Sequence, residues 1–290
     1  MGSALASPRV CRVREGARYV RWSRWSARCL TPLYALSILC VLGMLALSGC
    51  SLIGVRQSPA SQHTLASDGG TRLILRAACL PDAPACDLAK QRDAAMRVLS
   101  RRLAGRSAIA NPIVRADGAA NITVELPGMT DSGQVADVTA LLTGTGAVAV
   151  LDTGDAIVEV GESTAGQTCT TSCEAGQYRV VFTGDQMDRN QAAAKLDDVS
   201  GKWVVTFGFA GAAKQQFAAY TASHIGQALT ITSDDIVIES ATIQSMIDGP
   251  GEITGVDETE AKRLAAYLNS GSLPVALSVV STELVMPSGG

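Results

Sequence analysis

The segment before residue 50 restricts the fold most, because its composition separates it from any folded body. Residues 1–32 carry seven arginines and one acid, and residues 33–47 (LYALSILCVLGMLAL) are apolar and uncharged. This order, followed by small residues, is typical of a secretory signal. At about 1.5 Å per residue the apolar run spans roughly 22 Å, less than a bilayer core of about 30 Å. We therefore predict a signal peptide over residues 1–49; a single-pass membrane anchor is the alternative.

The junction Leu47-Ser48-Gly49-Cys50 resembles the lipobox of bacterial lipoproteins. In that family the cysteine thiol receives diacylglycerol, the signal is cleaved before the cysteine, and the new amino terminus is acylated, for example with palmitate. The resemblance implies lipidation at Cys50, and two or three acyl chains anchor a protein stably where one does not. The segment before the apolar run is longer than usual for the family, and a cysteine that merely ends a membrane helix is the alternative. Residues 50–67, rich in Ser, Ala and Gln, are then a lipid-anchored flexible tether.

The charge of the chain changes sign at the same point. Residues 1–49 hold seven of the 24 basic and one of the 27 acidic residues, and the other 17 and 26 give the remainder a net charge of −9. Nucleic-acid binding requires clustered Lys and Arg to neutralise phosphates. The longest basic cluster of the body is Arg101-Arg102 with Arg97 and Arg106, which we interpret as the solvated face of one helix. We therefore expect no nucleic-acid partner.

Four of the eight cysteines follow Cys50. Their spacing favours two local disulfides, Cys79–Cys86 and Cys169–Cys173, although four cysteines allow three pairings. A metal site is the alternative, but neither pair has the two-residue spacing of zinc ligands. A catalytic thiol would need a histidine close by, and neither of the two histidines lies beside a cysteine. We expect no metal and no cofactor.

Residues 71–151 alternate between patterns of strands and helices. Apolar residues recur at helical spacing before Gly105 and again over residues 135–142, and they alternate with polar residues over 122–126. Pro112 indicates an edge position for the strand that contains it. The predicted order is β-α-β-β-α-β, the ferredoxin-like plan. Its strands are expected at 71–78, 109–115, 122–126 and 147–151, and its helices at 88–105 and 135–142.

A second group of elements follows the polar, Gly-rich residues 152–176. Alternating Trp203, Val205, Phe207 and Phe209 predict a strand, and apolar residues from Phe217 to Leu229 predict a helix packed on it. With aromatic residues at only 4%, Val, Ile, Leu and Ala must build most of the core. We expect further strands at 178–182, 236–239, 241–247 and 275–281, a short helix or turn at 185–196, turn residues at 248–251, and a last helix from 256 to 268. The fold class is α+β.

Clusters that carry catalysis are not evident in the sequence. Gly144-Thr145-Gly146 lacks the third glycine and the strand-turn-helix setting of a dinucleotide loop. The acid pairs Asp197-Asp198 and Asp234-Asp235 are interpreted as turn residues, and no Gly-x-Ser-x-Gly motif is present. We expect that the protein is not an enzyme and that it has no catalytic, cofactor-binding or metal-binding residues.

Short stretches of the body resemble the protein-export subunit SecD, in the order that this family has them. The sequence ITVELPG at 122–128 is similar to the family's I-x-V-Q-L-P-G, and VLSRRLAG at 98–105 is similar to its I-x-x-R-V-x-x-x-G. Further similar stretches are DGGTRL (68–73), TGD (183–185), TFGFAGAAKQQFAAYTASHIG (206–226), ITG (253–255), EA, LA and LNSGSLP within 260–274, and PSG (287–289). In the first of these one residue is missing between the Asp and the Gly pair.

The resemblance implies an extracytoplasmic SecD-like domain. Its base would be ferredoxin-like and comprise residues 68–159 and 256–290, and a smaller α+β head would be inserted at 160–255. Its partners would be the Sec translocon or unfolded secreted proteins, reached from the membrane through the lipid anchor. The family's second membrane helix would begin where the given sequence ends, so we do not carry over proton-driven motor action. The cysteine pairs are a further departure from the family.

Three functions follow from these observations. The first is an accessory of protein export, which contacts chains through an apolar groove or a sheet edge. The second is a stand-alone binding lipoprotein for a small ligand or an envelope component. A closed pocket with convergent polar groups would favour this function. The third is an enzyme, which the absence of catalytic clusters disfavours. The export function rests on the family resemblance, because a fold alone does not fix a function.

Overall fold

The computed structural model describes residues 63–81, 86–104 and 109–288. The predicted signal peptide, Cys50 and most of the predicted tether lie outside these ranges. Over the described part of the chain, no helix is both long and apolar enough to cross a membrane. The last residues of the predicted tether form the short helix α1 (Leu65–Asp68), capped by Thr64 and with Leu65 buried. The prediction of a flexible tether is therefore wrong for its final turn, because Leu65 packs into the body.

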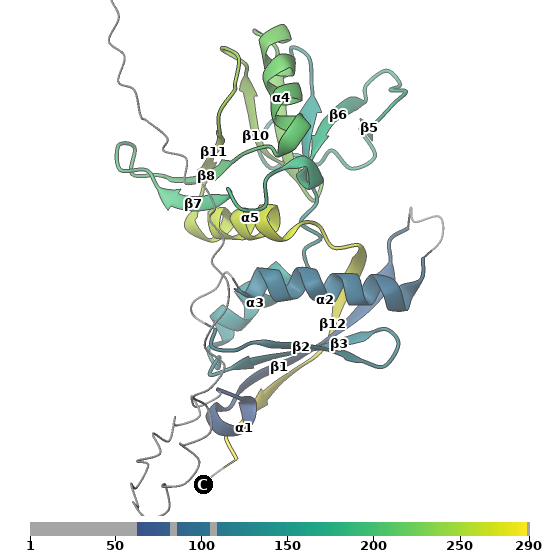
Figure 1. Cartoon of the computed structure of the whole chain (residues 1–290), viewed down its shortest axis with the longest axis vertical. Helices are drawn as coiled ribbons and strands as arrows, with labels where there is room; N and C mark the ends of the chain where they lie inside the picture. Colours follow the sequence, from purple (N-terminus) through teal and green to yellow (C-terminus); the bar gives the residue numbers. More distant parts are fainter. Residues whose placement is uncertain (1–62, 82–85, 105–108, 289–290) are drawn as a thin grey trace, which may run out of the picture. The chain divides into compact units, whose positions relative to one another are not determined.

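An antiparallel sheet of four strands begins and ends the described chain. Its order is β12-β1-β3-β2, and the helices α2 and α3 cover one of its faces (Figure 1). This is the strand order of a ferredoxin-like fold, so the predicted plan is confirmed for this part. The elements are β1 (Gly70–Cys79), α2 (Leu88–Ala104), β2 (Ile113–Asp117), β3 (Asn121–Pro127), α3 (Ser132–Thr143) and β12 (Val275–Val285). We call these six elements the base.

The strand that closes the base sheet is not the predicted one. The run at 147–151 was expected to complete it, but β4 (Val148–Asp152) pairs with strands of a different sheet, for example Val150 with Phe182 and Ile231. The last strand, β12, pairs with β1 along ten residues of β1 instead. A short apolar run predicts a buried strand but does not select its partners.

A mixed sheet of five strands has the order β10-β9-β4-β6-β5. The helix α4 packs on it, with Phe217 in contact with Phe182 and Phe209 at ring-centroid distances of 5.4 and 4.5 Å. The expected helix through Leu229 and strand at 241–247 are wrong, because Leu229 lies in β9 and β10 ends at Thr242. The elements are β5 (Thr168–Cys169), β6 (Tyr178–Thr183), α4 (Gly211–Ser223), β9 (Ala228–Ser233) and β10 (Ile236–Thr242).

A third, antiparallel sheet has the order β11-β8-β7 and carries the helix α5 on one face (Figure 1). Its elements are β7 (Ala193–Leu196), β8 (Trp203–Phe207), β11 (Gly251–Val256) and α5 (Glu258–Ser270), preceded by the short 3-10 helix η1 (Gly184–Gln186). The predicted base includes α5, but its apolar residues Ala261, Leu264 and Leu268 share a core with Val205 and Phe207 of this sheet. We call residues 148–270 the head.

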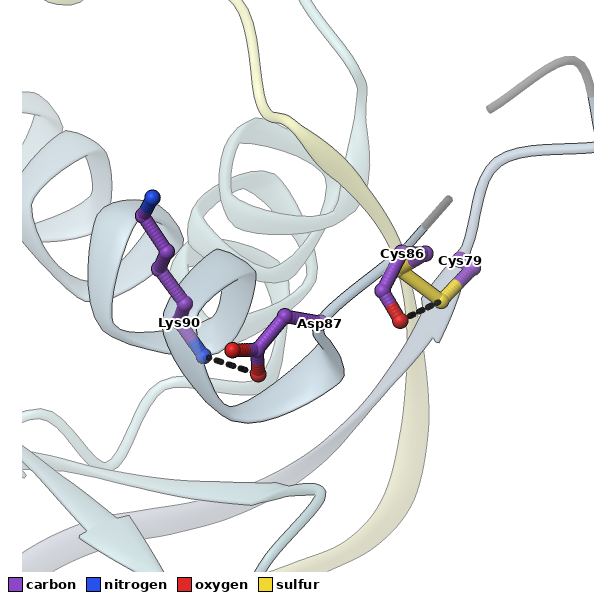
Figure 2. Close-up of a disulfide and its surroundings, with 4 residues drawn as sticks. All are labelled: Cys79, Cys86, Asp87 and Lys90. Carbon is purple, nitrogen blue, oxygen red and sulfur yellow. Dashed lines mark hydrogen bonds between the residues drawn. A yellow bond between two sulfur atoms is a disulfide. The ribbon is translucent and has the colours of Figure 1, made fainter. Parts of the chain in front are cut away.

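The structure pairs the cysteines locally, as their spacing favours. Cys79 is bonded to Cys86 with a Cα–Cα distance of 6.0 Å, and Cys169 is bonded to Cys173 at 5.3 Å. The first disulfide joins the end of β1 to the residue before the cap of α2. In that cap the Asp87 carboxylate accepts a hydrogen bond from the Lys90 backbone N–H at 3.2 Å (Figure 2). Both disulfides suit an oxidising compartment.

Replacing Cys79 and Cys86 together by alanine is expected to destabilise the base. Opening a loop of about eight residues costs roughly 2–3 kcal/mol in the chain-entropy model, which corresponds to about 5–10 °C in melting temperature. Thermal unfolding followed by circular dichroism would measure the change. A Cys169→Ala, Cys173→Ala variant, which opens a shorter loop away from any helix start, is the control and should lose less. An unchanged melting temperature for the first variant would contradict this role.

Candidate binding cleft

A cleft of about 770 Å³ opens where the base meets the head. Its base side comes from Ala140 and Thr143 of α3 and from Leu277 of β12. Its head side comes from the hairpin of β9 and β10, the end of β11, and one face of α5. The lining residues lie far apart in the sequence and meet only because the chain leaves the base after α3 and returns after α5. The cleft therefore depends on the two connections between base and head, one after α3 and one after α5.

One wall of the cleft is apolar and reaches its mouth. Val160 and Ile236 line the cleft, and the side chain of Val160 is 69% exposed. Ile236 is exposed as well, next to the turn that joins β9 to β10. These two side chains therefore extend the apolar lining of the cleft to its exposed edge.

The cleft also carries acidic side chains, Asp234 in the turn between β9 and β10 and Asp257 and Glu260 at the start of α5. Asp257 caps α5 by accepting from the Glu260 N–H at 2.8 Å, and the Asp234 carboxylate accepts from the Ala147 N–H at the same distance. Burial raises the pKa of the Glu260 carboxyl, its ion pair with Arg263 lowers it, and the charges of Asp257 and Asp234 raise it further. The lining of the cleft therefore carries three carboxylates against one cationic side chain, Arg263.

The acid pair Asp234-Asp235 is a turn, as predicted. Both residues have positive φ, 51° and 63°, which is the backbone of a two-residue hairpin turn. Aspartate tolerates this conformation better than most side chains. The turn fixes β9 against β10 and so sets the position of Ile236 at the mouth of the cleft.

The glycines of Gly144-Thr145-Gly146 have a packing role. A Cβ atom on Gly146 would lie 2.5 Å from Arg102 Nη2 and 2.8 Å from the Tyr267 ring, and one on Gly144 would overlap the Tyr267 hydroxyl. Tyr267 and Gly144 both line the cleft. The two glycines thus make room for a buried tyrosine and arginine.

The cysteines predicted from the sequence do not line the cleft. Within the described ranges, no group of three or more His, Cys, Asp or Glu side chains is arranged to hold a metal ion. Sequence reasoning missed the cleft altogether, since it assigned neither β9 nor β11 and placed Arg102 on a solvated face. What the cleft offers is apolar contact beside acidic side chains.

Comparison with known proteins identifies relatives of both parts. Residues 162–275 match the family described as the SecDF P1 head subdomain. The protein translocase subunit SecD of Acidaminococcus fermentans is 31% identical over 224 residues, covering 77% of this chain and 46% of the relative. SecD of Acetobacter pasteurianus is 30% identical over 233 residues, covering 77% and 43%. The chain thus spans less than half the length of these relatives.

Solved structures support the fold. A crystal structure of SecDF in its super-membrane-facing form matches with a TM-score of 0.61 and 23% identity, covering 78% of this chain and 32% of that one. A second structure, described as that of the membrane component SecDF that enhances protein export, matches with a TM-score of 0.55 and 24% identity, covering 72% and 98%. The fold is therefore α+β with several sheets, as in SecDF periplasmic domains. Sequence and structure together show that the chain is similar to the periplasmic domain of SecD.

Proposed function

We propose that the protein is an accessory of protein export that is anchored by lipid at Cys50 on the extracytoplasmic face of the bacterial cell membrane. The observation that carries the proposal is the similarity to SecD, which runs through 77% of the chain and includes base as well as head. A role in protein export or translocation follows from it at the coarse level. The anchor, the clients and the translocon contact are the finer parts of the proposal.

The cleft supports contact with exported chains. An unfolded polypeptide offers apolar side chains and an extended backbone, and a groove with exposed valine and isoleucine at its mouth can bury such side chains. A pocket for a small ligand would enclose its ligand and direct several polar groups inward. Here the polar groups Asp257, Glu260 and Arg263 are engaged in the cap and the ion pair of α5. The open cleft thus favours a chain over a small ligand.

Photo-crosslinking in the native cell tests this function. A photoreactive amino acid at Val160, at the mouth of the cleft, is expected to capture secreted chains or translocon subunits. The matched control is Val199, which is 96% exposed and does not line the cleft. We expect clearly more export-related adducts at Val160 than at Val199, identified by mass spectrometry. Equal yields at both sites, or an unrelated partner at Val160, would instead point to a stand-alone binding lipoprotein.

A further inference from the structure

Arg102 is the largest fully buried side chain of the described residues and comes from the last turn of α2. It is 1% exposed, although the sequence suggested a solvated position beside Arg101. Over the described part of the chain, no carboxylate forms an ion pair with it. Burial lowers the pKa of its guanidinium to about 10, so it stays charged at neutral pH. A buried cation of this kind is costly unless its donors are satisfied.

The guanidinium binds both connections between base and head. Toward the connection that leaves the base, Nη1 donates to the carbonyls of Leu141 and Gly144 at 2.7 and 2.6 Å, and Nη2 donates to that of Thr145 at 2.8 Å. Toward the connection that returns, Nε donates to Ser270 Oγ at 3.3 Å and Nη2 to the Gly271 carbonyl at 3.4 Å. One side chain thus donates hydrogen bonds to both connections between base and head.

Two further contacts join the two connections around Arg102, and we call this contact region the junction. The guanidinium carbon lies 4.4 Å from the centroid of the Tyr267 ring, a cation–π contact. The Leu273 N–H donates to the Thr145 carbonyl at 2.8 Å, so the two connections also bind each other next to Arg102. Tyr267 and Gly144 are both cleft residues. Arg102 therefore touches the inner end of the cleft without lining it.

We propose that Arg102 is a positioning residue that sets the geometry of the cleft by fixing both connections between base and head and the Tyr267 ring. The assignment of the cleft as the binding site rests on the proposed function. The positioning role of Arg102 does not depend on that function. A lysine could keep the charge but has three donors on one atom, and it cannot serve five acceptors spread over two segments. Arginine, with a planar fork of five N–H groups, can.

The test measures the distance between base and head in the full chain. Spin labels on unnatural amino acids at Asp137 of α3 and Lys214 of α4, both exposed, report the arrangement by pulsed electron resonance. In Arg102→Lys we expect a shifted or broadened distance distribution and a severalfold loss of crosslinks at Val160, with crosslinks at Val199 unchanged. The control Arg101→Lys, exposed on the same helix, should leave both readouts as in the unmodified protein. An unchanged distribution in Arg102→Lys would overturn the proposal.

A second variant keeps the proposal testable if Arg102→Lys does not fold. Tyr267→Leu removes the ring contact but leaves every acceptor of Arg102 in place, and the same shift, smaller in size, is expected. If Tyr267→Leu folds and its distribution is unchanged, the positioning role of the junction is overturned. Failure of the unmodified protein to crosslink at Val160 would instead count against the export function, and the distance measurement would still decide the role of Arg102.

Discussion

Replacing Leu126 by aspartate is expected to unfold the base. Leu126 is fully buried in β3, where it faces the core formed with α2 and α3. Removing a buried leucine costs about 2–5 kcal/mol, and a carboxyl group in its place adds the cost of an unpaired buried polar group. The total exceeds about 5 kcal/mol, which is comparable to the whole stability of many domains, about 5–15 kcal/mol.

Thermal or urea unfolding of the purified body would measure this effect. The matched control is Leu284→Asp, the same exchange in β12 of the same sheet, where the side chain is 59% exposed. Exposed substitutions usually change stability by no more than about 0.5 kcal/mol. If both variants unfolded alike, general sensitivity of the sheet and not burial would explain the result. A Leu126→Asp protein with the melting temperature of the unmodified chain would show that this face of β3 is not the core.

Replacing Cys50 by serine is expected to release the protein from membranes. A thioether-linked lipid cannot form on serine in this pathway, and without acyl chains the acidic body has little affinity for an anionic bilayer. Fractionation of cells, together with metabolic labelling by a palmitate analogue, would measure both the location and the lipid. We expect the label to be lost and the protein to move to the soluble fraction.

The matched control for this prediction is Cys40→Ser, which changes a cysteine inside the predicted signal peptide and should alter neither label nor location. If Cys50→Ser stayed in the membrane fraction, residues 33–47 would act as an uncleaved membrane helix. If it stayed there but lost the label, the unmodified protein would carry the lipid at Cys50 without depending on it for attachment. Either result would contradict the proposal that the lipid is the anchor.

Local sequence patterns predicted most elements of the base but not how the sheets are assembled. The alternation of Ile122, Val124 and Leu126 and the apolar face of α2 are properties of short windows, and the structure has these elements where expected. Val148–Asp152 was assigned to the wrong sheet, because its partners lie in β6 and β9, and β9 was read as part of a helix. Strand pairing depends on contacts between distant residues, which periodicity does not contain.

The candidate site was beyond the reach of the same reasoning. Arg101 and Arg102 are neighbours in a charged run, yet successive helical residues point about 100° apart, so one is exposed and the other is buried. The glycines at 144 and 146 were visible signals, but their packing role depends on Tyr267, more than a hundred residues later. The cysteine pairs were accessible because their partners are local.

The pairing of β1 with β12 also dictates an order of events as the chain is made. Arg72 and Glu283, which face each other across these strands, are separated by 211 positions. The head lies wholly between them, and its sheets need no strand from the base. A nascent chain, made amino end first, therefore completes the head while β1 still has an open edge, and an open edge can capture other extended chains. One edge of β1 pairs early with β3, but the other edge is among the last to be paired, and until β12 is made that edge stays open to other extended chains.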